Sequence, residues 1–193
     1  MHIAVFWGLV LLAQQAVAAT FEVDLWPEEG RPVFAAAATL LPLRQDPSWS
    51  AAALVPLPVS RGQEIAFDLT RYRTVVPGRI VVIAQREVTG RALGPITHLS
   101  RHDYYSGRFP GSSVHVAPPD TIEYLQYRAE GSCFVRIAGQ VIDAHDCPAF
   151  DTTSFHVLAQ PRTEWWIRVL ANGSAAGWLL VSDSTVRVID RRG

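Results

Sequence analysis

Near the carboxyl end of the chain, two apolar stretches rich in tryptophan are joined by a short polar segment. The stretches are residues 165–169 and 177–181, and Asn172-Gly173 lies between them. Asn and Gly accept the positive φ angles that a type I′ turn requires, and such turns match the twist of the flanking strands. The pattern predicts a β-hairpin and favours a small, tightly wound β-fold.

The rest of the chain is also dense in strand signals. Residues 64–69 alternate polar and apolar, and a β-branched run at 80–83 follows the turn residues Pro77-Gly78. Alternation is typical of a half-buried strand, and β-branched side chains suit a pleated surface. Short strands punctuated by Gly and Pro predict an all-β protein, either a barrel or a sandwich.

Two segments in the middle of the chain are less regular. Residues 92–119 are rich in Gly, Pro, Ser and His, so we expect a long connection that contains one short strand at 114–116. Residues 122–128 follow it. Their Tyr and Ile content favours a strand, but Asp120 and Glu123 could form a capping box, which leaves a short helix as the alternative.

The amino-terminal residues resemble a secretory signal peptide. An apolar run at 3–12 is followed by small residues at 16–19, which predicts a signal peptide over 1–19 and a mature chain that starts at Ala19 or Thr20. The alternative is an uncleaved anchor helix, although the run is short for ~30 Å of hydrocarbon. No later stretch is apolar for long enough to span a membrane, so we expect a periplasmic or secreted protein without stable membrane insertion.

The chain has two cysteines, Cys133 and Cys147. Residues 133–137 and 141–147 are expected to form a hairpin centred on Gln140, which would place the two thiols opposite each other. An even count in an exported protein favours a disulfide. Two reduced, buried thiols are the alternative.

Composition excludes several classes of function. The chain has 17 Arg, no Lys and 18 acidic residues, so its net charge is close to zero. This balance gives no electrostatic footprint for nucleic acid. The lack of lysine also excludes a Schiff-base lysine and a phosphate-loop lysine.

The carboxyl-terminal pattern resembles that of bacterial SH3-like domains. Trp166-x-x-Val169, a Gly-containing turn and Gly177-Trp178 are similar to the family's paired late strands, with one extra residue between Gly173 and Gly177. Upstream, residues 38–48 resemble the family's opening strand, and residues 57–65 resemble its following strand.

The resemblance implies two small SH3-like barrels in tandem. The expected units are 20–91, a degenerate first barrel, and 120–193, the second barrel, with 92–119 as the connection. The family implies a five-stranded barrel without catalysis whose members bind peptides, cell-wall fragments or protein partners. Trp165, Trp166 and Trp178 are the candidate ligand-binding residues; the alternative is that two of them fill the barrel core.

Two motifs that could carry chemistry are weaker. The segment from Asp146 to Phe150 superficially resembles the nucleophile motif of cell-wall cysteine peptidases, but a disulfide at Cys147 would prevent catalysis. His98 and His102 have the spacing of a helical metal site, but they lie in a segment expected to be a loop. No catalytic residue, cofactor or metal site is therefore predicted.

The leading hypothesis is a non-enzymatic binding module of the cell envelope. Its partner would be a peptide, a cell-wall fragment or an envelope protein. The alternative is a periplasmic inhibitor or immunity protein that blocks a secreted enzyme, with residues 92–119 as the inserted loop.

Overall fold

A computed structural model of the 193-residue chain describes residues 21–25 and 31–189. The predicted signal peptide lies outside these residues. The all-β prediction is confirmed, because the described part of the chain consists mostly of strands, with one five-residue helix, α1 (Arg101–Tyr105), and one 3₁₀ turn, η1 (Pro148–Phe150). No helix within the described ranges has the length and the apolar character needed to cross a bilayer.

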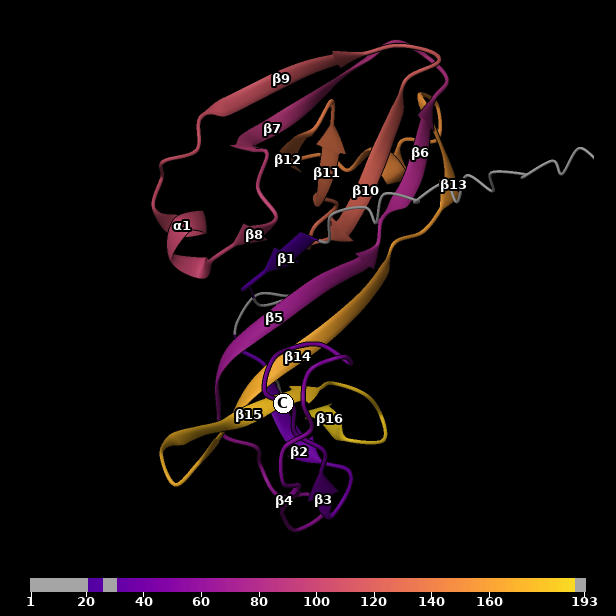
Figure 1. The fold of residues 1–193 in the computed structure, drawn as a ribbon. Helices are drawn as coiled ribbons and strands as arrows, with labels where there is room; N and C mark the ends of the chain where they lie inside the picture. Colours follow the sequence, from indigo (N-terminus) through magenta and orange to yellow (C-terminus); the bar gives the residue numbers. More distant parts are fainter. Residues whose placement is uncertain (1–20, 26–30, 190–193) are drawn as a thin grey trace, which may run out of the picture.

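The strands form two packed bodies joined by a long two-stranded ribbon (Figure 1). The ribbon consists of β5 (Phe67–Val76) and β14 (Arg162–Ala171), which pair antiparallel along most of their length. The terminal body gathers strands from both ends of the chain at one end of this ribbon. Its other strands are β2 (Val33–Ala36), β3 (Leu40–Leu41), β4 (Leu57–Pro58), β15 (Ser174–Leu180) and β16 (Val186–Ile189).

The inserted body, residues 78–159, is built on one antiparallel seven-stranded sheet with the order β13-β6-β10-β11-β12-β7-β9. Its apolar residues form a core that includes Ile80, Val88, Ile122, Val135 and Ile142. The strands are β6 (Gly78–Val82), β7 (Arg86–Gly94), β9 (Gly111–Val116), β10 (Thr121–Tyr127), β11 (Cys133–Ile137), β12 (Gln140–Ala144) and β13 (Phe155–Ala159).

Strand pairing crosses the boundaries of the two predicted units. The tryptophan hairpin β14–β15 pairs with β5, and β16 pairs with β2 in a separate two-stranded sheet, so strands from the end of the chain pair with strands from its first half. Isolated backbone bridges also join Arg44 to Trp178 of β15 and Ala35 of β2 to Glu64. The inserted body separates these two halves of the terminal body in the sequence.

The middle of the chain is more ordered than predicted. Residues 92–119 contain the end of β7, the two-residue strand β8 (His98–Leu99), α1 and β9, so they do not form one long loop. The strand expected at 114–116 begins earlier, at Gly111, and pairs with β7. Residues 121–127 form β10, which confirms the strand alternative over the helix.

The predicted disulfide joins Cys133 to Cys147, with 5.1 Å between their Cα atoms. The hairpin turn lies one or two residues earlier than predicted, at Ala138-Gly139, and both of these residues have positive φ angles. Cys133 is therefore opposite Ala144 rather than Cys147. The bridge forms because the chain folds back after β12, where the Cys147 amide donates to the Gly131 carbonyl at 2.7 Å.

A short amino-terminal strand, β1 (Phe21–Val23), lies at the joint between the bodies. It pairs antiparallel with β5 and parallel with β8. Phe21 is fully buried, and its ring lies 5.3 Å from that of Phe134 on β11. Phe21 and Phe134 form an apolar core at this joint together with Leu99 and Leu125. Strand β1 therefore packs against both the ribbon and the inserted body.

We predict that a fragment of residues 120–193 does not fold alone. Its hairpin β14–β15 lacks β5, and its β16 lacks β2, because both partners lie outside the fragment. A two-stranded hairpin is at best marginally stable in water. Circular dichroism should show a cooperative thermal transition for residues 20–193 and none for the fragment. Cooperative unfolding of the fragment would contradict this prediction and would support an independent second unit.

We also predict that the double variant Cys133→Ala, Cys147→Ala unfolds at lower urea concentration than the natural chain. The bridge closes a loop with a sequence separation of 14, and both cysteines are buried. Such a bridge contributes about 3 kcal/mol to the free energy of unfolding in the chain-entropy model. An unchanged urea midpoint would show that the bridge adds no stability; reduced natural protein is the matched comparison.

Candidate functional site

The two faces of β14 carry different chemistry because successive side chains of a strand point to opposite sides. Trp165, Ile167 and Val169 belong to the apolar core of the terminal body. Glu164, Trp166 and Arg168 lie on the other side, which we call the outer face. The register places Trp178 of β15 beside Arg168 and Arg71 of β5 beside Trp166, so these side chains share the outer face.

The three candidate tryptophans all pack against other residues. Trp165 stacks on Tyr72 with 5.1 Å between ring centroids and meets the ring of Phe34 edge-on at 5.1 Å. Trp166 is 1% exposed, and Trp178 is 7% exposed. Burial leaves Trp166 and Trp178 little ring surface for a ligand, so the ligand-binding role of these tryptophans stays a prediction.

Polar contacts fix two of the three indole rings. The Trp166 Nε1 donates to Glu164 Oε2 at 2.9 Å, and the Arg71 guanidinium lies 5.1 Å from the centre of the Trp178 ring. The Trp165 Nε1 is buried and has no hydrogen-bond partner among the described residues. A buried donor without a partner is costly. Of the three tryptophans, Trp165 is therefore the one whose buried indole N–H lacks a hydrogen-bond partner within the described residues.

A charged cluster crosses the outer face from β14 to β8. Arg71 forms two hydrogen bonds with Asp24, from Nε at 2.7 Å and from Nη2 at 3.1 Å. Arg73 donates to Glu22 at 2.7 Å and to Glu164 at 3.3 Å. Arg71 also reaches Glu22 at 3.4 Å, so the two arginines share three carboxylates drawn from β1, β14 and the residue that follows β1.

His98 of β8 completes this cluster at the joint between the bodies. Its Nε2 lies 3.0 Å from Asp24 Oδ2, and its side chain is 42% exposed. Burial by itself raises the pKa of Asp24, but hydrogen bonds from His98 and Arg71 and the Arg71 charge outweigh it, so the pKa lies below its ordinary value. Asp24 therefore stays ionised and connects a strand of each body.

The outer face also contacts an exposed tryptophan that the sequence did not single out. Trp49 is 59% exposed and lies in the turn of a hairpin formed by residues 40–58, which we call the Trp49 hairpin. Its ring meets the ring of buried Trp166 edge-on, at 6.1 Å between centroids. The signal available in the sequence was a lone tryptophan between Ser48 and Ser50, where no apolar period requires one.

Several contacts fix the turn that carries Trp49. The Arg44 guanidinium lies 5.7 Å from the centre of the Trp49 ring and donates to the Ala51 carbonyl at 3.0 Å. The Gln45 amide donates to the Ala52 carbonyl at 3.0 Å. The same hairpin exposes three more apolar side chains, Leu40, Leu54 and Val55. An exposed ring held in place by its neighbours offers contact area at low entropic cost.

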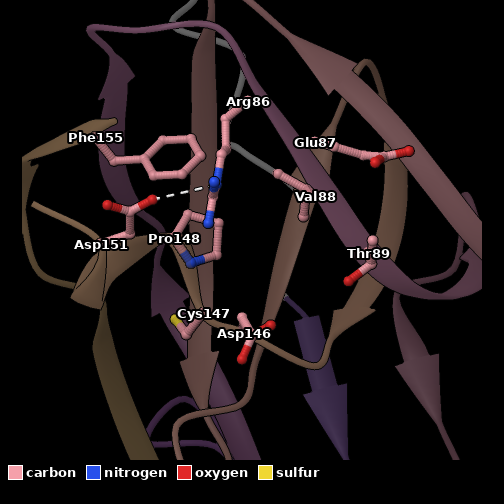
Figure 2. Close-up of a pocket in the computed structure, with 9 residues that line it drawn as sticks. All are labelled: Arg86, Glu87, Val88, Thr89, Asp146, Cys147, Pro148, Asp151 and Phe155. Carbon is pink, nitrogen blue, oxygen red and sulfur yellow. Dashed lines mark ion pairs between the residues drawn. The ribbon is translucent and has the colours of Figure 1, made fainter. Parts of the chain in front are cut away.

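A small pocket opens beside the disulfide in the inserted body (Figure 2). Its volume is about 50 Å³, and Arg86, Cys147, Pro148, Asp151 and Phe155 contribute to its lining. Known small-molecule sites are several times larger, roughly 300–1,000 Å³. Cys147 is bonded to Cys133, so its sulfur cannot act as a nucleophile while the bridge is intact.

The carboxylate of Asp151 at this pocket is held by local contacts. It accepts hydrogen bonds from the Thr153 hydroxyl at 2.5 Å and from the Thr153 amide at 3.0 Å, and these lower its pKa. Arg86 faces it at 3.4 Å (Figure 2). The charge of Asp151 is therefore paired with that of Arg86, while Glu87 and Asp146 also line the pocket.

A second buried charge cluster attaches α1 to the inserted body. Asp143 is 1% exposed and faces Arg91 at 2.6 Å and Arg128 at 3.3 Å. Arg91 lies 4.1 Å from the centre of the Tyr104 ring, and Arg128 donates to the Tyr104 hydroxyl at 2.6 Å. Burial, and after it the charge of Asp143, raises the pKa of Tyr104, so its hydroxyl stays protonated.

The two histidines considered as metal ligands do not share a helix face. His98 lies on β8 and contacts Asp24, whereas His102 is exposed on α1. Within the described ranges, no three side chains of the His, Cys, Asp and Glu types are grouped as a metal-ligand set.

Comparisons of the chain with protein-family models, with curated proteins and with solved structures found no match.

We predict that Asp24→Asn destabilises the protein in a pH-dependent way. The neutral amide cannot form the charged contacts with Arg71 and His98, so we expect a loss of about 2–3 kcal/mol at neutral pH. Because the folded pKa of Asp24 is lowered, its contribution is present above the unfolded value of about 3.9 and is lost as the pH falls through the folded value.

Urea unfolding of the variant and the natural chain between neutral and acidic pH measures this difference. Asp183→Asn is the control, because Asp183 is exposed. The difference between the Asp24 variant and the natural chain should shrink toward low pH. A difference that stays constant with pH would contradict the assignment of the effect to the carboxylate charge.

Proposed function

We propose that this protein is a non-enzymatic binding module of the cell envelope, and that the Trp49 hairpin is its recognition surface. The partner is a peptide, a cell-wall fragment or an envelope protein. The single observation that carries the proposal is that Trp49 is 59% exposed while contacts with Trp166 and Arg44 hold it in place. Such a ring is the usual form of an aromatic anchor in a binding surface.

We further propose one SH3-like unit, interrupted by an insertion, in place of two units in series. The segments that resemble the family, residues 38–48, 57–65 and the tryptophan hairpin, all lie in the terminal body. They are joined by the pairing of β5 with β14 and of β2 with β16. In this arrangement the tryptophan hairpin assigned to the second unit belongs with the strands assigned to the first.

The chemistry of the Trp49 hairpin supports binding of an extended or ring-shaped ligand. Leu40, Leu54 and Val55 provide exposed apolar contacts on the same hairpin as Trp49, and Arg44 adds a cation beside the ring. Peptides and sugar rings both use an aromatic face with a neighbouring hydrogen-bond donor. Across the outer face, the exposed pair Asp68–Arg168 adds polar groups of both signs.

The chemistry of the other sites supports a binding role rather than catalysis. The pocket beside the disulfide is small, Asp151 there is paired with Arg86, and Asp24 on the outer face is paired with Arg71. The disulfide itself supports a location outside the cytoplasm, where such bridges persist.

The inhibitor alternative has less support from the fold. It relied on residues 92–119 as an inserted loop, but these residues contain α1 and strands that pair within the molecule. An inhibitory loop would need to leave that packing in order to enter an active site. The alternative stays a prediction.

We predict that Trp49→Ala weakens binding by about tenfold or more, because an aromatic anchor carries a large share of binding energy. Stability should change by no more than about 1 kcal/mol, since the side chain is mostly exposed. Binding is measured by co-sedimentation with purified peptidoglycan and by capture of envelope proteins on the immobilised natural chain.

Phe150→Ala is the matched control, because Phe150 is 60% exposed but lies on the inserted body. It should bind as the natural chain does. The proposal fails if the natural chain binds neither peptidoglycan nor an envelope protein, or if Trp49→Ala binds as tightly as the natural chain.

A further inference from the structure

One strand of the inserted body forms a long and regular open edge. β9 pairs with β7 over six residues without a shift of register. Among the described strands it has no neighbour on its other side, and it lies at the outer margin of the inserted body (Figure 1). Its backbone groups on that side are therefore available to another strand.

The other outer strands of the two larger sheets are irregular, bridged or short, as is usual at the edges of natural sheets. β13 has a register shift between Val157 and Ala159. β15 is bridged by Arg44 on its outer side, and β8 is two residues long. In contrast, β9 has no charged residue, no proline and no bulge along its length.

The direction of the backbone groups on β9 follows from one hydrogen bond. The Ala92 amide donates to the Pro110 carbonyl at 3.0 Å, so Pro110 faces β7. In an antiparallel ladder, both polar groups of a residue point to the same neighbour, and successive residues alternate. Ser112 and Val114 therefore bond to β7, whereas Gly111, Ser113 and His115 direct their N–H and C=O groups outward.

We propose that β9 pairs antiparallel with β9 of a second copy, about a two-fold axis at Val114. In this register Ser113 lies opposite His115 of the partner subunit, and the two residues exchange both backbone hydrogen bonds. The symmetric pair does the same on the other side of the axis. Val114 meets its own counterpart in a non-hydrogen-bonded pair, where side chains approach closely.

The length and charge of β9 favour a second copy as the occupant. Pro110 and Pro118 bracket the strand, so two copies match in length and neither can extend the pairing. The strand has no charged residue, so self-pairing places no like charges opposite each other. Val114 is half-buried against the inserted core, and a second strand would cover it further.

The same features argue that the assembly ends at two copies. A two-fold contact uses the same edge on both subunits and leaves neither β9 free. The opposite edge of the seven-stranded sheet, β13, has its register shift at Val157 and Ala159 and so opposes continued addition. The expected product is a closed dimer with a continuous sheet across the axis.

The first test compares Ser113→Pro with Ser113→Ala in the full chain, using sedimentation equilibrium over a concentration series. Proline removes an outward N–H without removing a bond to β7, and edge strands tolerate it. Alanine removes only the hydroxyl, which donates to Glu87. We expect a dimer for the natural chain and for Ser113→Ala, and a monomer for Ser113→Pro.

A natural chain that stays monomeric throughout the series would overturn the proposal. A dimer that survives Ser113→Pro with the fold intact would also overturn it, because the contact would then lie elsewhere.

A second test gives an answer even if Ser113→Pro does not fold. Val114→Cys places two thiols opposite each other across the axis, at a separation that a disulfide can span. Ser112→Cys is the control, because its counterpart in this register is Val116 of the partner subunit. Mild oxidation should cross-link Val114→Cys into a dimer and leave Ser112→Cys monomeric on a denaturing gel. No cross-link at position 114, or equal cross-linking at position 112, would overturn the proposal.

Discussion

The pairing of β5 with β14 is the interaction on which the rest of the structure depends. Paired residues of these two strands are 86–102 positions apart in the sequence, from Val76–Arg162 at one end of the ladder to Phe67–Val169 at the other. Their inner face carries the core of the terminal body, and their far end leads into the inserted body. The ribbon positions β15, which follows β14 in the tryptophan hairpin, and β6, which follows β5 into the inserted body.

The charged cluster at β1 explains how the two bodies are held against each other. Glu22 and Asp24 alternate with the buried side chains Phe21 and Val23, so one short segment presents carboxylates to the outer face and apolar groups to the joint. Arg71 and His98, which contact Asp24, come from the ribbon and from β8. Charges that are removed from water are tolerated here because each one has a partner of opposite sign.

The proposed recognition surface and the proposed dimer contact lie on different bodies. The Trp49 hairpin belongs to the terminal body, and β9 forms the edge of the inserted body. Binding at the Trp49 hairpin would use exposed aromatic and apolar side chains, whereas binding at β9 would use backbone hydrogen bonds. Because the two surfaces share no residues, loss of one leaves the other available.

Local patterns in the sequence determined the all-β class, the Asn172-Gly173 turn and the bond between Cys133 and Cys147, because each depends on residues close together in the chain. Burial of Trp166 could not be foreseen from its alternation with Trp165, since Trp49 contacts it from another hairpin. The tertiary structure alone decided that the carboxyl-terminal hairpin pairs with β5 and that β16 pairs with β2 in a second sheet. The physical reason is that strand pairing depends on matching edges in space, and an insertion between two partners changes their separation in the sequence without changing those edges.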